Sequence, residues 1–156
     1  MKIADQDILE RLSQLERENE ALKRKLDHYE LAASGANDGL WDWTRDPNRR
    51  FVSAPWKSML GIPVTENVAP NLWEELLHPE DKAEAINQFN EFIEGRLDTY
   101  QQEFRLRHRD GSYKWILSKA TALRDGSGEI NRISGSHTDI TDQKMLQLEK
   151  ENLVEV

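Results

Sequence analysis

The sequence has no cysteine among its 156 residues, and this absence excludes several kinds of chemistry. Disulfide bonds, thiolate metal sites, cysteine nucleophiles and photochemistry that ends in a cysteinyl adduct all need that side chain. The sequence also has no apolar run near the roughly 20 residues that span a bilayer, and Met1–Asp7 lacks the pattern of a signal peptide. We therefore expect a cytoplasmic protein with no membrane segment in this chain.

Basic charge is scarce as well, because 21 Lys and Arg stand against 29 Asp and Glu, a net charge of −8. Broad binding to nucleic acid or to an anionic membrane depends on a basic face whose contacts release counterions. The charge balance therefore argues against nucleic acid as a partner. The length suits one domain of about 100–120 residues with attached elements.

The N-terminal segment contains no Gly, Pro or Trp from Asp5 to Leu31, and its apolar residues repeat as in a coiled coil. One heptad frame places these residues at a and d positions: Ile8, Leu12, Leu15, Leu22, Leu26 and Tyr29. Asn19 takes the remaining a position, where a buried Asn fixes the register of a parallel dimer. In a parallel dimer, this frame places a g residue of one chain next to an e residue of the other, and three such pairs have opposite charges: Arg11–Glu16, Glu18–Lys23 and Lys25–Glu30. The segment predicts a parallel homodimer; the alternative is an amphipathic helix that lies on its own domain.

From Ser34 the composition becomes rich in aromatic and turn residues, and Ser34–Gly39 predicts a break after the first helix. Alternating apolar and polar residues predict strands over 40–44, 50–53, 99–108, 113–123 and 130–138. Helical spacing predicts helices over 55–61 and, in two pieces split near residue 78, over 71–94. This order indicates an α+β domain whose five-stranded antiparallel sheet carries short helices on one face. The predicted organisation is a coiled-coil helix at 1–31, a domain at 32–141 and the start of a C-terminal helix at 142–156.

Five blocks of sequence, in this order, resemble the PAS sensor domains. They are 39–43 (GLWDW), 51–56 (FVSAPW) with 59–61 (MLG), 78–81 (HPED), 104–116 (FRLRHRDGSYKWI) and 135–141 (GSHTDIT). The resemblance covers about residues 29–144 and implies the PAS fold in a cytoplasmic input module of a bacterial signalling protein. It also implies a covalently linked effector, such as a diguanylate cyclase or the histidine kinase of a two-component system, beyond this chain. The flanking helices would be its signalling connectors.

Large aromatic residues are candidates for a ligand pocket on the covered face of the sheet: Trp43, Trp56, Phe104 and Trp115. The alternative is that they only fill the core of a small domain. A non-covalent small ligand or flavin remains open, whereas the missing cysteine excludes a flavin adduct. Haem-binding members of the resembled family place their ligand in the helix after HPED, where this chain has Ala85, Ile86 and Phe89, so the resemblance argues against haem.

The triplet Asp139, Ile140 and Thr141, here called the relay junction, ends the last strand and precedes the C-terminal helix. Its oxygen atoms suit an N-cap, which accepts hydrogen bonds from unpaired backbone N–H groups. The resemblance implies that the same residues connect the sheet to the output helix. We expect Ile140 to be buried there, and Asp139 to cap the helix or pair with Arg107 or Arg109.

Other polar groups have structural interpretations. The HPED run reads as a helix start at His78 rather than a metal site. The Ser134–Asp139 stretch contains Ser, His and Asp, but it lacks a nucleophile elbow, and alternation separates His137 from Ser136, so no catalytic site is predicted. The sequence therefore predicts a sensory input and dimerisation module without enzyme activity or a metal site. The alternative function is a ligand-free structural module for protein–protein interaction.

Overall fold

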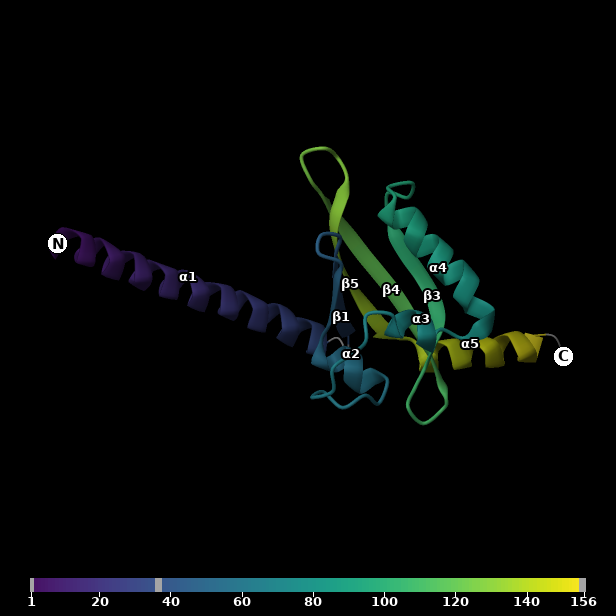
Figure 1. The fold of residues 1–156 in the computed structure, drawn as a ribbon. Helices are drawn as coiled ribbons and strands as arrows, with labels where there is room; N and C mark the ends of the chain where they lie inside the picture. Colours follow the sequence, from purple (N-terminus) through teal and green to yellow (C-terminus); the bar gives the residue numbers. More distant parts are fainter. Residues whose placement is uncertain (1, 36–37, 155–156) are drawn as a thin grey trace. The chain divides into compact units, whose positions relative to one another are not determined.

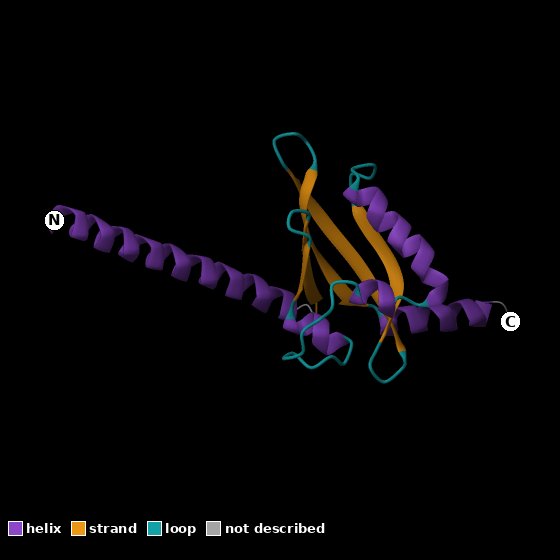
Figure 2. Ribbon diagram, viewed as in Figure 1, coloured by secondary structure: helices purple, strands orange, loops and turns teal. Residues whose placement is uncertain are grey.

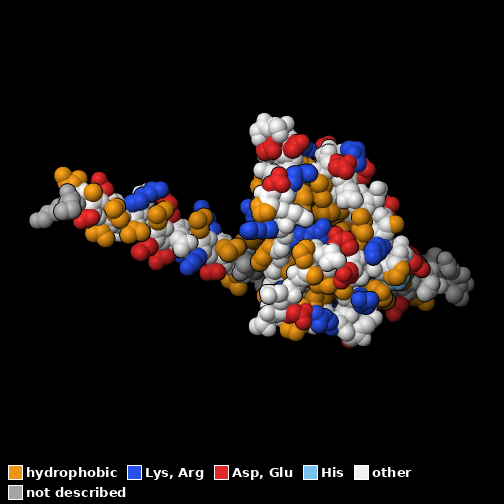
Figure 3. Space-filling view, viewed as in Figure 1, with side chains coloured by type: hydrophobic (Ala, Val, Ile, Leu, Met, Phe, Trp, Pro, Cys, Tyr) orange, Lys and Arg blue, Asp and Glu red, His pale blue; other side chains and the backbone are white. Residues whose placement is uncertain are grey.

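The computed structural model of the chain describes residues 2–35 and 38–154, which belong to two compact units divided after residue 36. The first unit is one helix, α1 (Lys2–Gly35). It continues past Leu31 to Gly35, so the predicted break begins too early; Ala36 and Asn37 lie outside the described residues. Hydrophobic and charged side chains both lie along its length in Figure 3. Within the described ranges, no helix is long and apolar enough to cross a membrane.

The second unit is an antiparallel sheet with four further helices (Figures 1 and 2). Its elements are β1 (Asp38–Thr44), β2 (Arg49–Val52), α2 (Ala54–Met59), α3 (Leu72–Leu76), α4 (Pro79–Ile93), β3 (Tyr100–Arg107), β4 (Tyr113–Arg124), β5 (Ile130–Asp139) and α5 (Thr141–Val154). The strand order is β2-β1-β5-β4-β3, and every neighbouring pair is antiparallel. The predicted α+β class and five-stranded sheet are confirmed.

Strict alternation gives the sheet an inner and an outer face. On β3 the inner side chains are buried, including Phe104 and Leu106 at 0% exposure, while the residues between them are more exposed. On β4 the inner side chains include Ile116 and Ser118, also at 0%. Helices α2, α3 and α4 pack over this inner face, where apolar burial drives the packing.

Two hairpin turns set the register of the three long strands. Asp110 Oδ1 accepts a hydrogen bond from the Ser112 N–H at 2.8 Å, and Gly111 has φ +90°. Asp125 repeats the arrangement between β4 and β5, accepting from the Ser127 N–H at 2.9 Å. In the first turn the positive φ lies at Gly111, directly after Asp110, and in the second it lies at Gly128 (φ +87°). Glycine is favoured at both positions because few other residues adopt a positive φ at low cost.

Helix α4 starts as the sequence predicts, at His78. The His78 Nδ1 atom accepts from the Glu80 N–H at 3.1 Å, which caps the helix. Asp81 in the first turn pairs with the Arg105 guanidinium at 2.8 Å, and this hydrogen-bonded cation lowers the pKa of the Asp81 carboxyl. The ion pair fastens α4 to strand β3.

Candidate functional site

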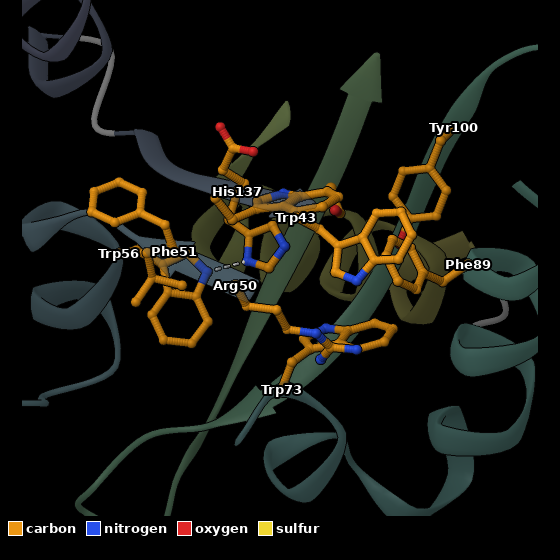
Figure 4. A pocket seen from close by; sticks show the side chains of 12 residues that line it. Trp43, Arg50, Phe51, Trp56, Trp73, Phe89, Tyr100 and His137 are labelled. Carbon is orange, nitrogen blue, oxygen red and sulfur yellow. Dashed lines mark hydrogen bonds between the residues drawn. The ribbon is translucent and has the colours of Figure 1, made fainter. Parts of the chain in front are cut away.

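A cavity of about 60 Å³ lies on the inner face of the sheet in the second unit (Figure 4). Seven aromatic side chains line it: Trp41, Trp43, Phe51, Trp56, Trp73, Phe89 and Tyr100. They come from β1, β2, β3, α2, α3 and α4, so most of the unit contributes to one space. Its remaining lining residues are Asp42, Arg50, Val52, Ser118 and His137.

His137 of β5 is a buried titratable group of the cavity, with 4% of its surface exposed. Its Nδ1 atom accepts a hydrogen bond from Trp56 Nε1 at 2.8 Å, drawn as a dashed line in Figure 4. Burial lowers the pKa of His137 to about 3, so the imidazole is neutral near pH 7 and carries its proton on Nε2. The bond joins α2 to the central strand β5. Sequence reasoning assigned His137 no role, because only the folded chain brings it to Trp56.

Three hydrogen-bonding groups of the lining have no partner among the described residues. They are Trp41 Nε1, Trp73 Nε1 and Ser118 Oγ, all buried. A buried donor without a partner loses its bonds to water, at a cost of about 1–3 kcal/mol. Tyr100, by contrast, accepts from Gln102 Nε2. Burial raises the pKa of its phenol to about 12, and the Gln102 amide and the neighbouring Ser118 hydroxyl oppose this rise. The cavity thus combines an aromatic wall with unpaired donors.

The two charged residues of the lining already have partners. Arg50, which extends toward Trp73 in Figure 4, forms an ion pair with Glu74 of α3 at 2.7 Å. The Asp42 carboxylate pairs with Arg132 at 2.5 Å and accepts from Ser134 at 3.0 Å. Because both charges are compensated and His137 is neutral, the cavity has no uncompensated charge among its described lining residues.

The predicted pocket residues divide into three groups. Trp43 and Trp56 line the cavity. Phe104 is fully buried, with its ring centroid 5.6 Å from that of Trp73, but it is not a lining residue. The placement of Trp115 on the covered face is wrong. Its neighbour Ile116 points inward, so Trp115 lies on the outer face, partly covered by α5.

The relay junction forms a small hydrogen-bonded network. Asp139 Oδ1 accepts from the Thr141 N–H at 2.9 Å, and Thr141 Oγ1 accepts from the Trp115 N–H at 3.0 Å. Ile140 is 7% exposed, as predicted, and its N–H donates to the Trp115 carbonyl at 2.8 Å. Asp139 thus caps the helix and forms no ion pair with an arginine of the described chain. The predicted partner Arg109 pairs with Glu66 instead.

The predicted coiled-coil positions all lie on α1, and their side chains are exposed within the first unit. Leu15 is 43% exposed and Leu22 is 64% exposed. The other members are Ile8, Leu12, Asn19, Leu26 and Tyr29. An apolar stripe of this length is not covered by residues of its own unit.

Across the described ranges, no cluster of three His, Asp or Glu side chains could hold a metal ion.

Comparison with known proteins agrees with this architecture. The family described as PAS fold matches residues 49–137. The chain is 26% identical over 140 residues to a probable diguanylate cyclase of Escherichia coli (strain K12), a match that covers 88% of this chain. It spans only 12% of the length of that relative.

Two solved structures are similar over more than two thirds of the chain. A sensory box histidine kinase/response regulator from Burkholderia thailandensis E264 has a TM-score of 0.68 and 34% identity, covering 82% of this chain and 98% of that one. The N-terminal domain of a diguanylate cyclase with PAS/PAC sensor from Marinobacter aquaeolei has a TM-score of 0.61 and 25% identity, covering 69% and 98%. The family match and these likenesses converge: the chain belongs to the PAS fold family and is homologous to domains of sensory histidine kinases and diguanylate cyclases.

Proposed function

We propose that this chain is the sensory input and dimerisation module of a cytoplasmic signalling protein, with no catalytic activity of its own. An effector of the diguanylate cyclase or histidine kinase type would receive its signal. The chain spans only 12% of the length of the cyclase relative, which is consistent with a separate effector. The observation that carries the proposal is the continuous bonded path from the cavity, through β5 and the relay junction, to α5.

The path begins at His137, which lines the cavity and lies two residues before Asp139 on the same strand. The junction then bonds both its backbone and its Thr141 hydroxyl to Trp115 of the neighbouring strand β4. Packed strands move together, because their hydrogen bonds resist independent displacement. A change in cavity packing is therefore expected to reach the first turn of α5.

Side chains of α5 extend this contact to the outer face of the sheet. Lys144 Nζ pairs with Glu103 of β3 at 2.5 Å and lies 5.0 Å from the centroid of the Trp115 ring. The Arg105 guanidinium also lies 5.0 Å from the Trp115 ring centroid. Cation–π contacts of this kind contribute about 0.5–1 kcal/mol at exposed sites. This strength would hold α5 against the sheet and still allow a signal to displace it.

Dimerisation through α1 is the second part of the proposal. Its support is the exposed heptad stripe with Asn19 at a central a position and three matched charge pairs. Burying leucines such as Leu12 and Leu26 between two copies would remove apolar surface from water. A parallel pair would place two copies of the effector side by side.

A double-mutant cycle in the full-length protein tests the path without a known signal. Ser118→Leu fills the cavity and serves as a constant input, Asp139→Ala breaks the junction, and effector output is measured in each variant. We expect Ser118→Leu to change output, and Asp139→Ala to remove most of that change. Asp125→Ala is the matched control, since Asp125 makes the same local bond at a distant hairpin.

Two outcomes would contradict the relay. If Ser118→Leu changes effector output equally in the Asp139→Ala background, the junction acts only as a helix cap. If Ser118→Leu leaves effector output unchanged while the near-ultraviolet circular dichroism stays native, the result would favour the alternative of a ligand-free structural dimeriser. Dimerisation is tested separately by light scattering at about 50 µM, well above a micromolar dissociation constant, where a monomeric mass would overturn it.

A further inference from the structure

We infer that the cavity takes a small uncharged molecule that presents a hydrogen-bond acceptor, such as a carbonyl oxygen, to Ser118 and two indole N–H groups. This inference rests on the proposed sensor function and names the chemistry of its ligand. It follows from the unpaired donors, the charge balance and the size of the cavity.

The donors define the polar side of the ligand. Trp41 Nε1 and Trp73 Nε1 can only donate, and the Ser118 hydroxyl can donate as well. His137 accepts from Trp56 through Nδ1, and its other ring nitrogen points away from Trp56 in Figure 4. A ligand that supplies acceptor atoms would satisfy buried groups that are otherwise unpaired, whereas a ligand that only donates would not.

The charges around the cavity exclude an ionic ligand. The Arg50 guanidinium is bonded to Glu74, and the Asp42 carboxylate is bonded to Arg132 and Ser134. An anion inside would have to take Arg50 from its carboxylate partner. A cation could lie against the aromatic rings, but it would bring no acceptor atom to the unpaired N–H groups and would be repelled by their positive ends. Burying an ion without a partner is costly, so the ligand is uncharged.

The volume of the cavity limits the size of the ligand. A cavity of about 60 Å³ exceeds the space that one water needs, on the order of 10–15 Å³. It is smaller than the engineered apolar cavity of about 150 Å³ that admits benzene in another protein. A ligand of about four non-hydrogen atoms fits between these limits, and acetone is a suitable probe of that class.

Titration of acetone into the ¹⁵N-labelled chain tests the inference through the indole N–H resonances. We expect saturable downfield shifts for Trp41 and Trp73, with a dissociation constant in the range of about 1–10 mM for four non-hydrogen atoms. The resonance of Trp115, on the outer face, is the internal control. Acetate has the same number of non-hydrogen atoms but a charge, and it should bind at least about tenfold more weakly.

Two serine variants separate hydrogen bonding from simple filling. Ser118→Ala should weaken acetone binding by about 2–10-fold, the loss of one hydrogen bond. Ser136→Ala, on the adjacent strand β5 but on the outer face, should leave it unchanged.

Three results would overturn the inference. They are a linear shift of all indole signals without saturation, equal affinity in the Ser118→Ala variant, or tighter binding of acetate. The first would mean that water alone pairs the donors. Because binding is measured without any effector, failure here leaves the output cycle as an independent test of the relay.

Discussion

Replacing either of two buried serines by alanine should change the stability of the protein in opposite directions. This contrast tests the hydrogen-bond assignments of the cavity. Ser53 is 4% exposed, and its Oγ accepts from the Leu40 N–H at 2.9 Å and the Trp56 N–H at 3.4 Å. Ser118 is 0% exposed, and its Oγ has no partner among the described residues. Alanine removes the hydroxyl at either position with little change of volume.

The expected magnitudes follow from the bonds lost. Ser53→Ala removes the N-cap of α2, worth about 0.5–2 kcal/mol, and leaves the part-buried Leu40 N–H without this partner. We therefore expect the free energy of unfolding to fall by about 1–3 kcal/mol. An unpaired buried hydroxyl costs about 1–3 kcal/mol, and Ser118→Ala removes it together with its van der Waals contacts. After the lost contacts are subtracted, we expect the free energy of unfolding to rise by about 1 kcal/mol.

Urea unfolding followed by tryptophan fluorescence measures both changes. The protein is first refolded from guanidinium chloride and dialysed, which removes any co-purified ligand. The denaturant slope should stay constant while the midpoint moves in opposite directions. A loss of more than about 1 kcal/mol for Ser118→Ala would contradict this prediction, because it would mean that the hydroxyl forms a stabilising bond.

Three further predictions concern the junction, the buried histidine and the coil. In urea unfolding, Asp139→Ala should cost about 0.5–2 kcal/mol as the loss of a cap, and Ile140→Ala about 2–5 kcal/mol as a buried truncation; the reverse order would contradict the assignment. The folded pKa of His137, about 3, lies below the unfolded value of about 6.5. The unfolded chain therefore binds more protons in this window, and stability should fall as pH drops below about 6.5, by up to about 1.4 kcal/mol per pH unit. His137→Gln should flatten the unfolding free energy between pH 7 and 5, and equal slopes would count against a neutral buried imidazole. Asn19→Leu should raise the melting temperature while light scattering detects higher oligomers or register mixtures; a uniform dimer would show that Asn19 does not set specificity.

Local patterns in the sequence predicted much of the fold. The alternation in β3 and β4 and the Asp-Gly turn at Asp110 identified the long hairpin, because strand period and turn chemistry are short-range properties. The strand order, with β5 in the centre, could not be obtained in this way. It depends on which edges pair after the chain crosses between β2 and β3, which single-sequence periodicity does not encode.

The candidate site was predicted less completely. Alternation separates Trp115 from Ile116 but does not say which of the two faces the helices cover, and an aromatic ring next to Arg105 and Lys144 can be half-buried on the outer face. His137 and Ser118 gave little local signal, since their role depends on Trp56 and on a cavity built from eight elements. A polar residue at an inner-face position of a predicted strand was the one available sign.

In the proposed dimer, cavity packing controls the arrangement of the two α5 helices. Because the sequence has no cysteine, Gln147→Cys on the exposed face of α5 gives one spin label per chain. Double electron–electron resonance then measures the distance between the two labels, with Ser118 intact and with Ser118→Leu. We expect a defined interspin distance that shifts when the cavity is filled. Absence of dipolar coupling, or the same distance distribution in both proteins, would contradict it.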